Sequence, residues 1–447
     1  MADSSILPTG GRNREEVAKI EIGRTNVSPT VARGLVLFFL ACIVVVPVME
    51  IVVPTWLSAE PSATVWSRLS ALPDQMSAAM AAEAARGHTS LWKRVIAANR
   101  AAMSGMLDFE NALEDESVIG RTLRPPAQLV LTRWLGAGNE RVYVGRQGAD
   151  GTRWLFYRPD LEYLTGSGFL EPEVIRRRIA AASEWTALPQ PDPRPAILSF
   201  HRALQARGIT LIVMPTPVKP GVHPEKLTAS SPSERAVVQN ASYDEFMEFL
   251  RSSGVLVFDP AEALASARAA APQYLATDTH WRPEAMELVA GRLAAFVTQH
   301  AALSEVKAPD YRIEEVEVTN VGDTVVMLDL PSRQQLYPPE RVLASRVVTA
   351  QGPWRSDRAA DVLVLGDSFS NIYSLDSMGW GSSAGFVEQL SYALRRPADR
   401  IVQNDDGAFA TREMLQRAGP QRLEGKRVVI WQFAARELAS GDWREMK

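Results

Sequence analysis

Three residues of this chain have the types that serine-based acyl transfer uses, and they lie in two short segments. Ser368 follows an apolar run and is the last residue of a Gly-Asp-Ser sequence. Asp278 and His280 lie two residues apart in the sequence Thr-Asp-Thr-His-Trp. A serine hydroxyl becomes a nucleophile when a nearby base removes its proton, and a carboxylate can orient that base. We therefore predict Ser368 as nucleophile, His280 as base and Asp278 as the orienting group.

Each of the two segments also has an ordinary structural interpretation. A serine after Gly-Asp can simply begin a turn or cap a helix, and a histidine beside a tryptophan can be a half-buried core residue. Two-residue spacing does not place Asp278 and His280 on one face of a helix, but their side chains can converge in an extended or turn segment. Because each segment supplies what the other needs, their presence in one chain favours a catalytic triad.

Other residues are candidates for oxyanion stabilisation or substrate binding. The tetrahedral intermediate of acyl transfer carries an oxyanion that N–H donors stabilise, and the Ser368 amide is one such donor. The further candidates are Gly407, Asn404, Gln432, Arg436 and Trp281. Gly407 can offer an unobstructed backbone N–H, whereas Asn404 and Gln432 carry side-chain amides. Arg436 can bind a substrate or pair with Glu437, and all of these residues can equally serve turns or packing.

The elements that must position these residues alternate between strand and helix. Strands are predicted over 210–214, 255–258, 362–366, 400–404 and 427–432, and helices over 196–207, 243–252, 283–297 and 385–394. This alternation indicates βαβ units and a parallel sheet flanked by helices, that is, an α/β fold. Open sheets of this kind bind ligands at the carboxyl ends of their strands. Ser368 and the segments after two later strands are therefore expected to line one cleft.

The chain is predicted to have four parts. Residues 1–33 form a polar tail without apolar periodicity, and residues 34–57 form an apolar run. Residues 58–130 are rich in alanine and methionine at helical spacing and are interpreted as a helical stalk or linker. Residues 131–447 form the α/β domain, which includes a β-rich insertion over about 301–350.

The apolar run over 34–57 is long enough to cross a bilayer, and Trp56 is placed like an interfacial anchor. Arg14, Lys19, Arg24 and Arg33 precede this run and only Arg68 follows it closely. The positive-inside rule then predicts a single-pass inner-membrane protein with a cytoplasmic amino terminus and a periplasmic catalytic domain. A signal peptide cleaved at the small residues 58–59 or 62–63 is the alternative, and the long leading tail favours the uncleaved anchor.

Composition excludes several classes of function. The 447 residues carry a net charge of −4, with 46% hydrophobic and 22% charged residues, and no basic stripe typical of nucleic-acid binding. The single cysteine, Cys42, lies in the apolar run, so there is no disulfide framework or thiolate metal site. The five histidines are scattered along the chain. We therefore expect neither a metal nor a cofactor.

The motifs resemble those of the SGNH-hydrolase-like polysaccharide O-acetyltransferases of the alginate acetylation machinery, the AlgJ/AlgX-like family. The specific part of the resemblance is the Asp-Thr-His-Trp sequence at 278–281, the Gly-Asp-Ser-Phe-Ser sequence at 366–370 and the Met-Gly-Trp-Gly sequence at 378–381. Further similar stretches are 145–156, 214–227 and 429–432, so that the resemblance covers roughly residues 135–440. The Asp-x-His segment precedes the serine, as in this family, whereas ordinary SGNH esterases have the reverse order.

The resemblance implies an SGNH-like fold and the same three catalytic residues. It further implies a periplasmic O-acetyltransferase that passes acetyl groups through an acetyl-serine to hydroxyls of an exopolysaccharide. The implied partners are the polysaccharide acceptor, a membrane-bound O-acyltransferase as acetyl donor, and other proteins of exopolysaccharide synthesis and export. Two alternatives remain open: an SGNH esterase or deacetylase with the same triad, and a non-catalytic assembly protein that binds polysaccharide.

Overall fold

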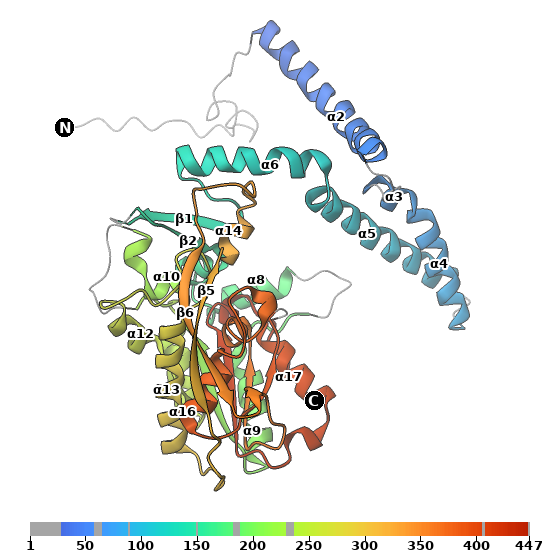
Figure 1. Ribbon diagram of the computed structural model, residues 1–447. Helices are drawn as coiled ribbons and strands as arrows, with labels where there is room; N and C mark the ends of the chain where they lie inside the picture. Colours follow the sequence, from blue (N-terminus) through green and yellow to red (C-terminus); the bar gives the residue numbers. More distant parts are fainter. Residues whose placement is uncertain are drawn as a thin grey trace, which may run out of the picture. The chain divides into compact units, whose positions relative to one another are not determined.

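Figure 1 shows a computed structural model of the chain, which describes residues 28–57, 65–87, 90–148, 151–181, 188–228, 237–404 and 407–445. Most of the predicted polar tail, residues 1–27, lies outside the described residues, as do the alternative cleavage sites at 58–59 and 62–63. The chain divides into two compact units, residues 1–125 and residues 126–447.

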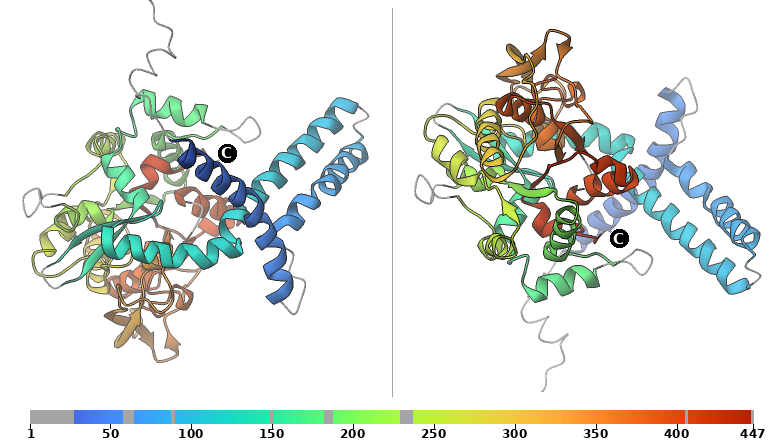
Figure 2. Two further views of the ribbon diagram at one scale, coloured as in Figure 1. Left: turned by 90° about the horizontal axis from the view of Figure 1, so that it is seen from above. Right: turned by 90° about the horizontal axis from the view of Figure 1, so that it is seen from below.

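The described part of the first unit is helical. Its helices are α2 (Pro29–Leu57), α3 (Val65–Ser70), α4 (Leu72–Ala85) and α5 (Leu91–Asp115). Helices α4 and α5 lie side by side in the views of Figure 2. The alanine, methionine and leucine residues of this region have high helix propensity. The unit has a small core in which the rings of Trp66 and Phe109 meet edge to face, with 5.4 Å between their centroids.

The predicted membrane anchor over residues 34–57 requires a correction. Crossing a bilayer takes about 20 consecutive, predominantly apolar residues in one helix. Within the part of the chain that the structure describes, no helix combines the length and the apolarity that this requires. The prediction of a single-pass inner-membrane protein anchored by residues 34–57 is therefore wrong.

The second unit is built on a parallel five-stranded sheet in the order β4-β3-β10-β8-β9. The strands are β3 (Thr210–Thr216), β4 (Leu256–Val257), β8 (Val362–Gly366), β9 (Asp399–Val402) and β10 (Val428–Ala434). The central strand β10 pairs with β3 on one side and β8 on the other, and all pairs are parallel. The predicted α/β class with a parallel sheet is confirmed.

Successive residues of the central strands enter two different cores. On one face Ile212, Val364 and Ile430 pack against α13 (Pro283–His300) and α16 (Phe386–Leu394). On the other face Val213, Leu365 and Trp431 pack against α9 (Pro193–Gln205), α11 (Tyr243–Ser252) and α17 (Gly407–Arg417). Side chains alternate between the faces of a strand, so continuous apolar runs such as 362–365 mark strands covered on both sides. Figure 1 shows α13 and α16 side by side on one side of the sheet.

A second, antiparallel sheet occupies the region predicted as a β-rich insertion. Strands β5 (Arg312–Asn320) and β6 (Glu340–Thr349) pair along their whole length, and β7 (Gly352–Pro353) extends β6. Not all of this region is strand, because Asp323–Met327 forms the short helix α14. Its β-branched residues have a high strand propensity, but tertiary contacts of Asp323 and Thr324 hold this turn.

The remaining elements connect or flank these sheets. Strands β1 (Val142–Gln147) and β2 (Arg153–Tyr157) form an antiparallel hairpin. The other elements are α6 (Val118–Val130), α7 (Arg158–Thr165), α8 (Pro172–Ala180), α10 (Lys219–Val222), α12 (Ala261–Ala267), α15 (Ser368–Asn371) and α18 (Glu437–Ser440), with the π-helical turn η1 (Leu131–Leu135) and the 3-10 turns η2 (Pro224–Lys226), η3 (Asp376–Met378) and η4 (Pro420–Leu423).

A buried ion cluster ties the edge strand β9 to the segment before β10. Both oxygens of the Asp399 carboxylate are paired: Lys426 Nζ lies 2.8 Å from Oδ2, and Arg422 donates to Oδ1 at 2.7 Å. The Lys426 ammonium also donates to the carbonyls of Arg358 and Ala360. The hydrogen bonds and charges of its partners outweigh burial and lower the pKa of Asp399.

We predict that Asp399→Ala lowers the free energy of unfolding by about 3–5 kcal/mol, because it leaves the buried Lys426 charge without its partner. Urea unfolding of the full chain measures this change. The matched control is Glu413→Ala, which removes an exposed partner of Arg417 at 2.8 Å and should cost less than about 1 kcal/mol. Equal effects of the two substitutions would contradict the assignment of Asp399 as a structural ion site.

Candidate active site

Asp278 and His280 lie in a tight loop between α12 and α13. Tyr274 and Trp281 form an isolated antiparallel bridge at its base, and the Leu275 amide donates to the His280 carbonyl at 3.1 Å. The chain reverses direction between Tyr274 and Trp281. Within this turn the His280 amide donates to Asp278 Oδ1 at 3.1 Å. The loop, which we call the catalytic loop (residues 276–280), therefore brings together the side chains of Asp278 and His280, which a helix would place on different faces.

The three predicted catalytic side chains meet in one chain of hydrogen bonds. His280 Nδ1 lies 2.7 Å from Asp278 Oδ1, and His280 Nε2 lies 2.8 Å from Ser368 Oγ. All three residues are buried, with exposed fractions of 2% for Asp278, 4% for His280 and 9% for Ser368. With the Nδ1 proton on the aspartate side, Nε2 is left as the acceptor of the serine proton.

Two N–H donors hold the second oxygen of Asp278. Trp380 Nε1 donates to Asp278 Oδ2 at 2.9 Å, and the Asp323 amide donates to the same oxygen at 3.0 Å. Burial alone would raise the pKa of Asp278, but the hydrogen bond and charge of His280 and the backbone amides of Asp323 and His280 lower it to about 2. For His280, burial lowers the pKa, and the Asp278 hydrogen bond and charge outweigh it and raise the pKa above 6.5.

Ser368 stands at the end of β8, where the chain turns into α15. The Asp367 side chain caps this turn by accepting the Phe369 amide at 2.9 Å, and its other oxygen accepts the Ala434 amide at 2.6 Å from the neighbouring strand β10. Ser368 is the first residue of the helical turn, so helix geometry gives its backbone N–H no intrahelical partner. Asp367 thus anchors the turn, and the Ser368 amide is available as an oxyanion donor.

Side chains from distant segments hold the backbone of the catalytic loop. Lys219 Nζ, which is fully buried, donates to the carbonyls of Ala276 and Asp278 at 2.9 Å each and of Leu155 at 2.5 Å. From β6, the Glu340 carboxylate accepts the amides of Ala276 and Thr277 at 2.9 and 2.6 Å. Burial lowers the pKa of Lys219 to about 8. The position of the loop therefore depends on charges supplied by α10 and β6.

Asp323 is a second carboxylate beside the histidine. It is the first residue of α14, and its Oδ1 accepts the Thr279 amide at 2.8 Å while its Oδ2 accepts the Thr279 hydroxyl. The same Oδ2 lies 3.6 Å from His280 Nδ1. Burial and the charge of Asp278 raise the pKa of Asp323 to about 6. The insertion thus adds a weakly acidic group to the catalytic loop.

Four further residues at this site were not predicted from the sequence: Asp323, Glu340, Lys219 and Trp380. Trp380 and Lys219 lie in stretches that carried the family resemblance, which was the available signal for them. Asp323 and Glu340 lie in the insertion, and nothing in their sequence neighbourhoods distinguishes them from surface acids.

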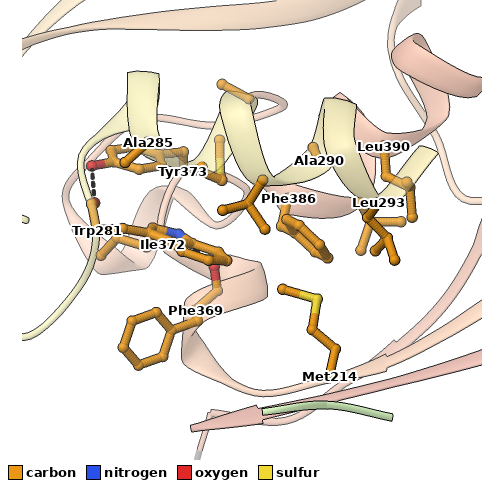
Figure 3. Close-up of a cluster of buried hydrophobic side chains, with 14 of the residues drawn as sticks. Met214, Trp281, Ala285, Ala290, Leu293, Phe369, Ile372, Tyr373, Phe386 and Leu390 are labelled. Carbon is orange, nitrogen blue, oxygen red and sulfur yellow. Dashed lines mark hydrogen bonds between the residues drawn. The ribbon is translucent and has the colours of Figure 1, made fainter. Parts of the chain in front are cut away.

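Trp281 and Gln432 are fully buried, and their side chains contact the serine turn. Figure 3 shows the Trp281 ring among buried side chains, where it meets the Phe369 ring edge to face at 5.4 Å between centroids. Its Nε1 donates to the Phe369 carbonyl at 3.1 Å. The Gln432 amide nitrogen donates to Thr216 Oγ1 at 3.0 Å and Asp367 Oδ1 at 2.8 Å. Both residues therefore support the serine turn from behind.

The other predicted binding residues lie after β9 and β10. The Asn404 Oδ1 atom accepts a hydrogen bond from Asn371 Nδ2 at 2.7 Å, one turn after Ser368. Gly407 begins α17 with φ +66°, and a Cβ there would lie 2.3 Å from a Glu437 oxygen. Arg436 pairs with the buried Asp160 at 3.1 Å and lies over the Tyr157 ring. None of these contacts brings the three residues to Ser368 directly.

An opening of about 460 Å³ adjoins the catalytic loop. Its walls come from the catalytic loop, from residues 320–327 of the insertion and from residues 372–379 after the serine turn. Asp278 and His280 form part of its lining. We call this opening the His280 cleft.

One group of side chains in the described residues has the composition of a metal site. Ligand atoms of Asp278, His280 and Asp323 lie within 4.8 Å of one another. However, both Asp278 oxygens already accept N–H donors and His280 Nδ1 is hydrogen-bonded to Asp278. The Asp278 oxygens and His280 Nδ1 are thus already engaged in hydrogen bonds.

The arrangement is suited to acyl transfer through a serine. His280 can take the Ser368 proton as the serine attacks a carbonyl carbon, and Asp278 can stabilise the resulting imidazolium. The Ser368 amide can donate to the oxyanion of the tetrahedral intermediate.

Comparison with known proteins agrees with this chemistry. A family model described as the SGNH hydrolase-like domain of the acetyltransferase AlgX matches residues 148–435. The probable alginate O-acetylase AlgJ of Pseudomonas aeruginosa is 28% identical over 251 residues, which are 54% of this chain and 62% of that protein. AlgJ of Azotobacter vinelandii is 26% identical over 252 residues, 55% of this chain and 63% of the relative. The chain thus spans less than two thirds of the length of these relatives.

Among solved structures, the O-acetyltransferase domain of Pseudomonas putida AlgJ is similar to this chain. It has a TM-score of 0.49 and 20% sequence identity, and the match covers 67% of this chain and 92% of that one.

We predict that acylation of Ser368 by an activated ester rises with pH as His280 loses its proton, with a midpoint above 6.5. Asp278→Asn removes the charge that raises the histidine pKa, so burial dominates and the midpoint moves to lower pH. The maximal rate should fall by roughly 10³–10⁴-fold. Stopped-flow rates across pH measure both effects, and His300→Ala, at an exposed helix end, should leave them unchanged. A rate that does not vary across the titration range of imidazole would contradict the role of His280.

We also predict that Trp380→Phe lowers the acylation rate about tenfold, because it removes one hydrogen bond to the ionised Asp278 and keeps an aromatic ring. Trp354→Phe is the matched control, since Trp354 Nε1 is also buried and donates to Ser391 Oγ at 2.9 Å. Both variants should lose similar stability in thermal unfolding, but only Trp380→Phe should slow acylation. Equal acylation rates in the two variants would show that the Trp380 hydrogen bond does not act on the triad.

Proposed function

Since the chain belongs to the family of the SGNH hydrolase-like domain of the acetyltransferase AlgX, we propose that it is an O-acetyltransferase that modifies hydroxyls of a polysaccharide. Ser368 carries the acetyl group between donor and acceptor, His280 moves the protons and Asp278 orients His280. The observation that carries this proposal is the hydrogen-bonded chain of the three side chains, with His280 Nε2 2.8 Å from Ser368 Oγ.

The first half of the reaction acylates the serine. Ser368 Oγ attacks the carbonyl carbon of an acetyl ester while His280 Nε2 takes the hydroxyl proton. The tetrahedral intermediate carries its negative charge on the former carbonyl oxygen, where the Ser368 N–H is a donor. When the intermediate collapses, the bond to the leaving oxygen breaks and His280 returns the proton to that oxygen. The products are acetyl-Ser368 and the deacetylated donor.

The second half repeats these steps with a sugar hydroxyl. His280 removes the hydroxyl proton as the sugar oxygen attacks the acetyl-serine carbonyl. The new tetrahedral intermediate collapses with Ser368 as leaving group, and His280 returns the proton to Ser368 Oγ. The acetyl group ends on the sugar and the triad returns to its starting state.

The substrate and partners of the proposed reaction follow from relatives and family resemblance. Curated relatives are named as probable alginate O-acetylases, which supports a polysaccharide as acceptor. The family resemblance supports a membrane-bound O-acyltransferase as the protein that presents the acetyl group, together with other proteins of exopolysaccharide synthesis and export.

We predict that the full chain gains the mass of one acetyl group when it is incubated with an activated acetyl ester, and that Ser368→Ala does not. Intact-protein mass spectrometry measures the adduct, and a digest locates it. Ser370→Ala is the control, because this neighbouring buried serine donates to Gln432 Oε1 at 2.7 Å instead of contacting His280.

The acceptor distinguishes the transferase from its rivals. Adding an oligosaccharide should discharge the adduct and yield acetylated sugar. Discharge to free acetate at a rate independent of sugar would establish an esterase. If the unmodified chain forms no adduct, the proposed mechanism is contradicted.

A further inference from the structure

Asp323 reaches the catalytic loop from the β-rich insertion. The segment that carries it is docked closely, because a Cβ on Gly322 would lie 2.0 Å from the Thr277 carbonyl oxygen. The Thr324 hydroxyl donates to the same carbonyl, and the Asp323 amide donates to Asp278 Oδ2 at 3.0 Å. A side chain at position 322 would not fit, so the position of the Asp323 carboxylate is fixed by the packing of backbone against backbone.

The Asp323 carboxylate lies beside the imidazole ring of His280. Its Oδ2 atom is 3.6 Å from His280 Nδ1, which is too long for a hydrogen bond but short enough for an opposite charge to favour the imidazolium. Thr279 lies between the two groups, since its hydroxyl donates to Asp323 Oδ2 and its Oγ1 is 3.1 Å from Nδ1. The Thr279 amide donates to Asp323 Oδ1 at 2.8 Å. Both carboxylate oxygens are thus held by the residue that precedes the catalytic histidine.

The protonation states of His280 and Asp323 are linked in both directions. Burial lowers the pKa of His280, the hydrogen bond and charge of Asp278 raise it, and the charge of Asp323 raises it further. Burial and the charge of Asp278 raise the pKa of Asp323, whereas the charge of His280 lowers it. Each of the two groups therefore favours the charged form of the other. His280 becomes an imidazolium when it takes the Ser368 proton, so a carboxylate in this position favours that proton transfer.

Three further charged side chains surround the catalytic loop, one each from α10, β6 and the segment after β10: Lys219, Glu340 and Arg436. Lys219 donates to three backbone carbonyls, and Glu340 accepts two backbone amides of the loop. The charge of Arg436 acts against the imidazolium, but its guanidinium pairs with Asp160 at 3.1 Å. Asp323 instead lines the His280 cleft, where its side chain is 29% exposed.

We propose that Asp323 is a second positioning residue of the triad, which favours the imidazolium of His280 through the charge that it places beside Nδ1. This inference rests on the proposed transferase function and adds a fourth residue to its machinery. Asp278 keeps the role of orienting the ring, because it is the partner of Nδ1 at 2.7 Å. Since the pKa of Asp323 is about 6, its support is present at neutral pH and is lost as the pH falls below that value.

Asp323→Asn tests the inference, because it removes the charge and keeps the size of the side chain. We expect the midpoint of the His280 titration to fall by about one pH unit, and the limiting rate of Ser368 acylation at high pH to fall about tenfold. NMR titration of the full chain labelled with ¹³C-histidine measures the midpoint, and stopped-flow acylation by an activated acetyl ester measures the rate. Among the five histidines, the signal of His280 is the one lost in His280→Gln.

Three control variants separate the charge of Asp323 from its place in the fold. Asp310→Asn removes a carboxylate of the insertion whose side chain is 74% exposed, and it should change neither the midpoint nor the rate. Thr324→Val removes the buried hydroxyl that donates to the Thr277 carbonyl, so it should lower the thermal stability and leave the midpoint unchanged. Asp323→Glu keeps the charge and should keep the midpoint of the unmodified chain, although the longer side chain can slow acylation.

The outcomes separate failure of this inference from failure of the proposed function. If the unmodified chain forms no acetyl-serine, the proposed function fails, whereas the NMR titration still tests the effect of Asp323 on His280. The inference is overturned if Asp323→Asn leaves the midpoint unchanged, or if the midpoint falls and the acylation rate does not. If Asp323→Asn does not fold, Asp323→Glu decides, because a lowered midpoint in a variant that keeps the charge contradicts the inference.

Discussion

The site depends on satisfying the backbone of five residues that belong to no helix or strand. In the catalytic loop, carbonyls of Ala276 and Asp278 accept from Lys219, and amides of Ala276 and Thr277 donate to Glu340. Buried backbone groups without partners are costly, so a loop with this shape is stable only where other segments provide donors and acceptors. Those segments are α10, which follows β3 of the parallel sheet, and β6 of the antiparallel one. The two sheets therefore fix the loop together.

The charges at this loop are placed for position more than for stability. Lys219 is fully buried and Glu340 is half-buried, and taking charged groups out of water has a desolvation cost that can exceed the gain from their interactions. Their donors and acceptors are directed at backbone atoms, which fixes Asp278 relative to Ser368 across a separation of ninety residues in the sequence. Ser368 is fixed independently, because Asp367 bridges the serine turn to β10. The catalytic loop and the serine turn are thus anchored separately, and they meet where His280 Nε2 lies 2.8 Å from Ser368 Oγ.

The sequence was informative where function depends on local pattern and uninformative where it depends on tertiary contacts. The apolar runs predicted the parallel strands, and the two motifs pointed to the three side chains that the fold brings together, whose catalytic role remains a proposal. Glu340 and Asp323 were not identified, because a surface acid and an acid that accepts loop amides look alike in sequence. Helix α14 lies in the region predicted as β-rich, and its contacts with the catalytic loop determine its conformation. The apolar run at 34–57 predicted a membrane anchor, which the described helices do not support.

The two carboxylates beside His280 are chemically distinct because of their donors. Asp278 accepts N–H groups at both oxygens and keeps a pKa of about 2, so it stays ionised wherever the histidine is a base. Asp323 accepts from Thr279 alone, lies close to the charge of Asp278 and has a pKa of about 6. Orientation of the base therefore falls to Asp278, whereas Asp323 changes charge near the range where His280 titrates. As the pH falls, protonation of Asp323 removes a negative charge beside the imidazole and protonation of His280 removes the base, so acyl transfer is expected to be fastest at a pH where both carboxylates are ionised.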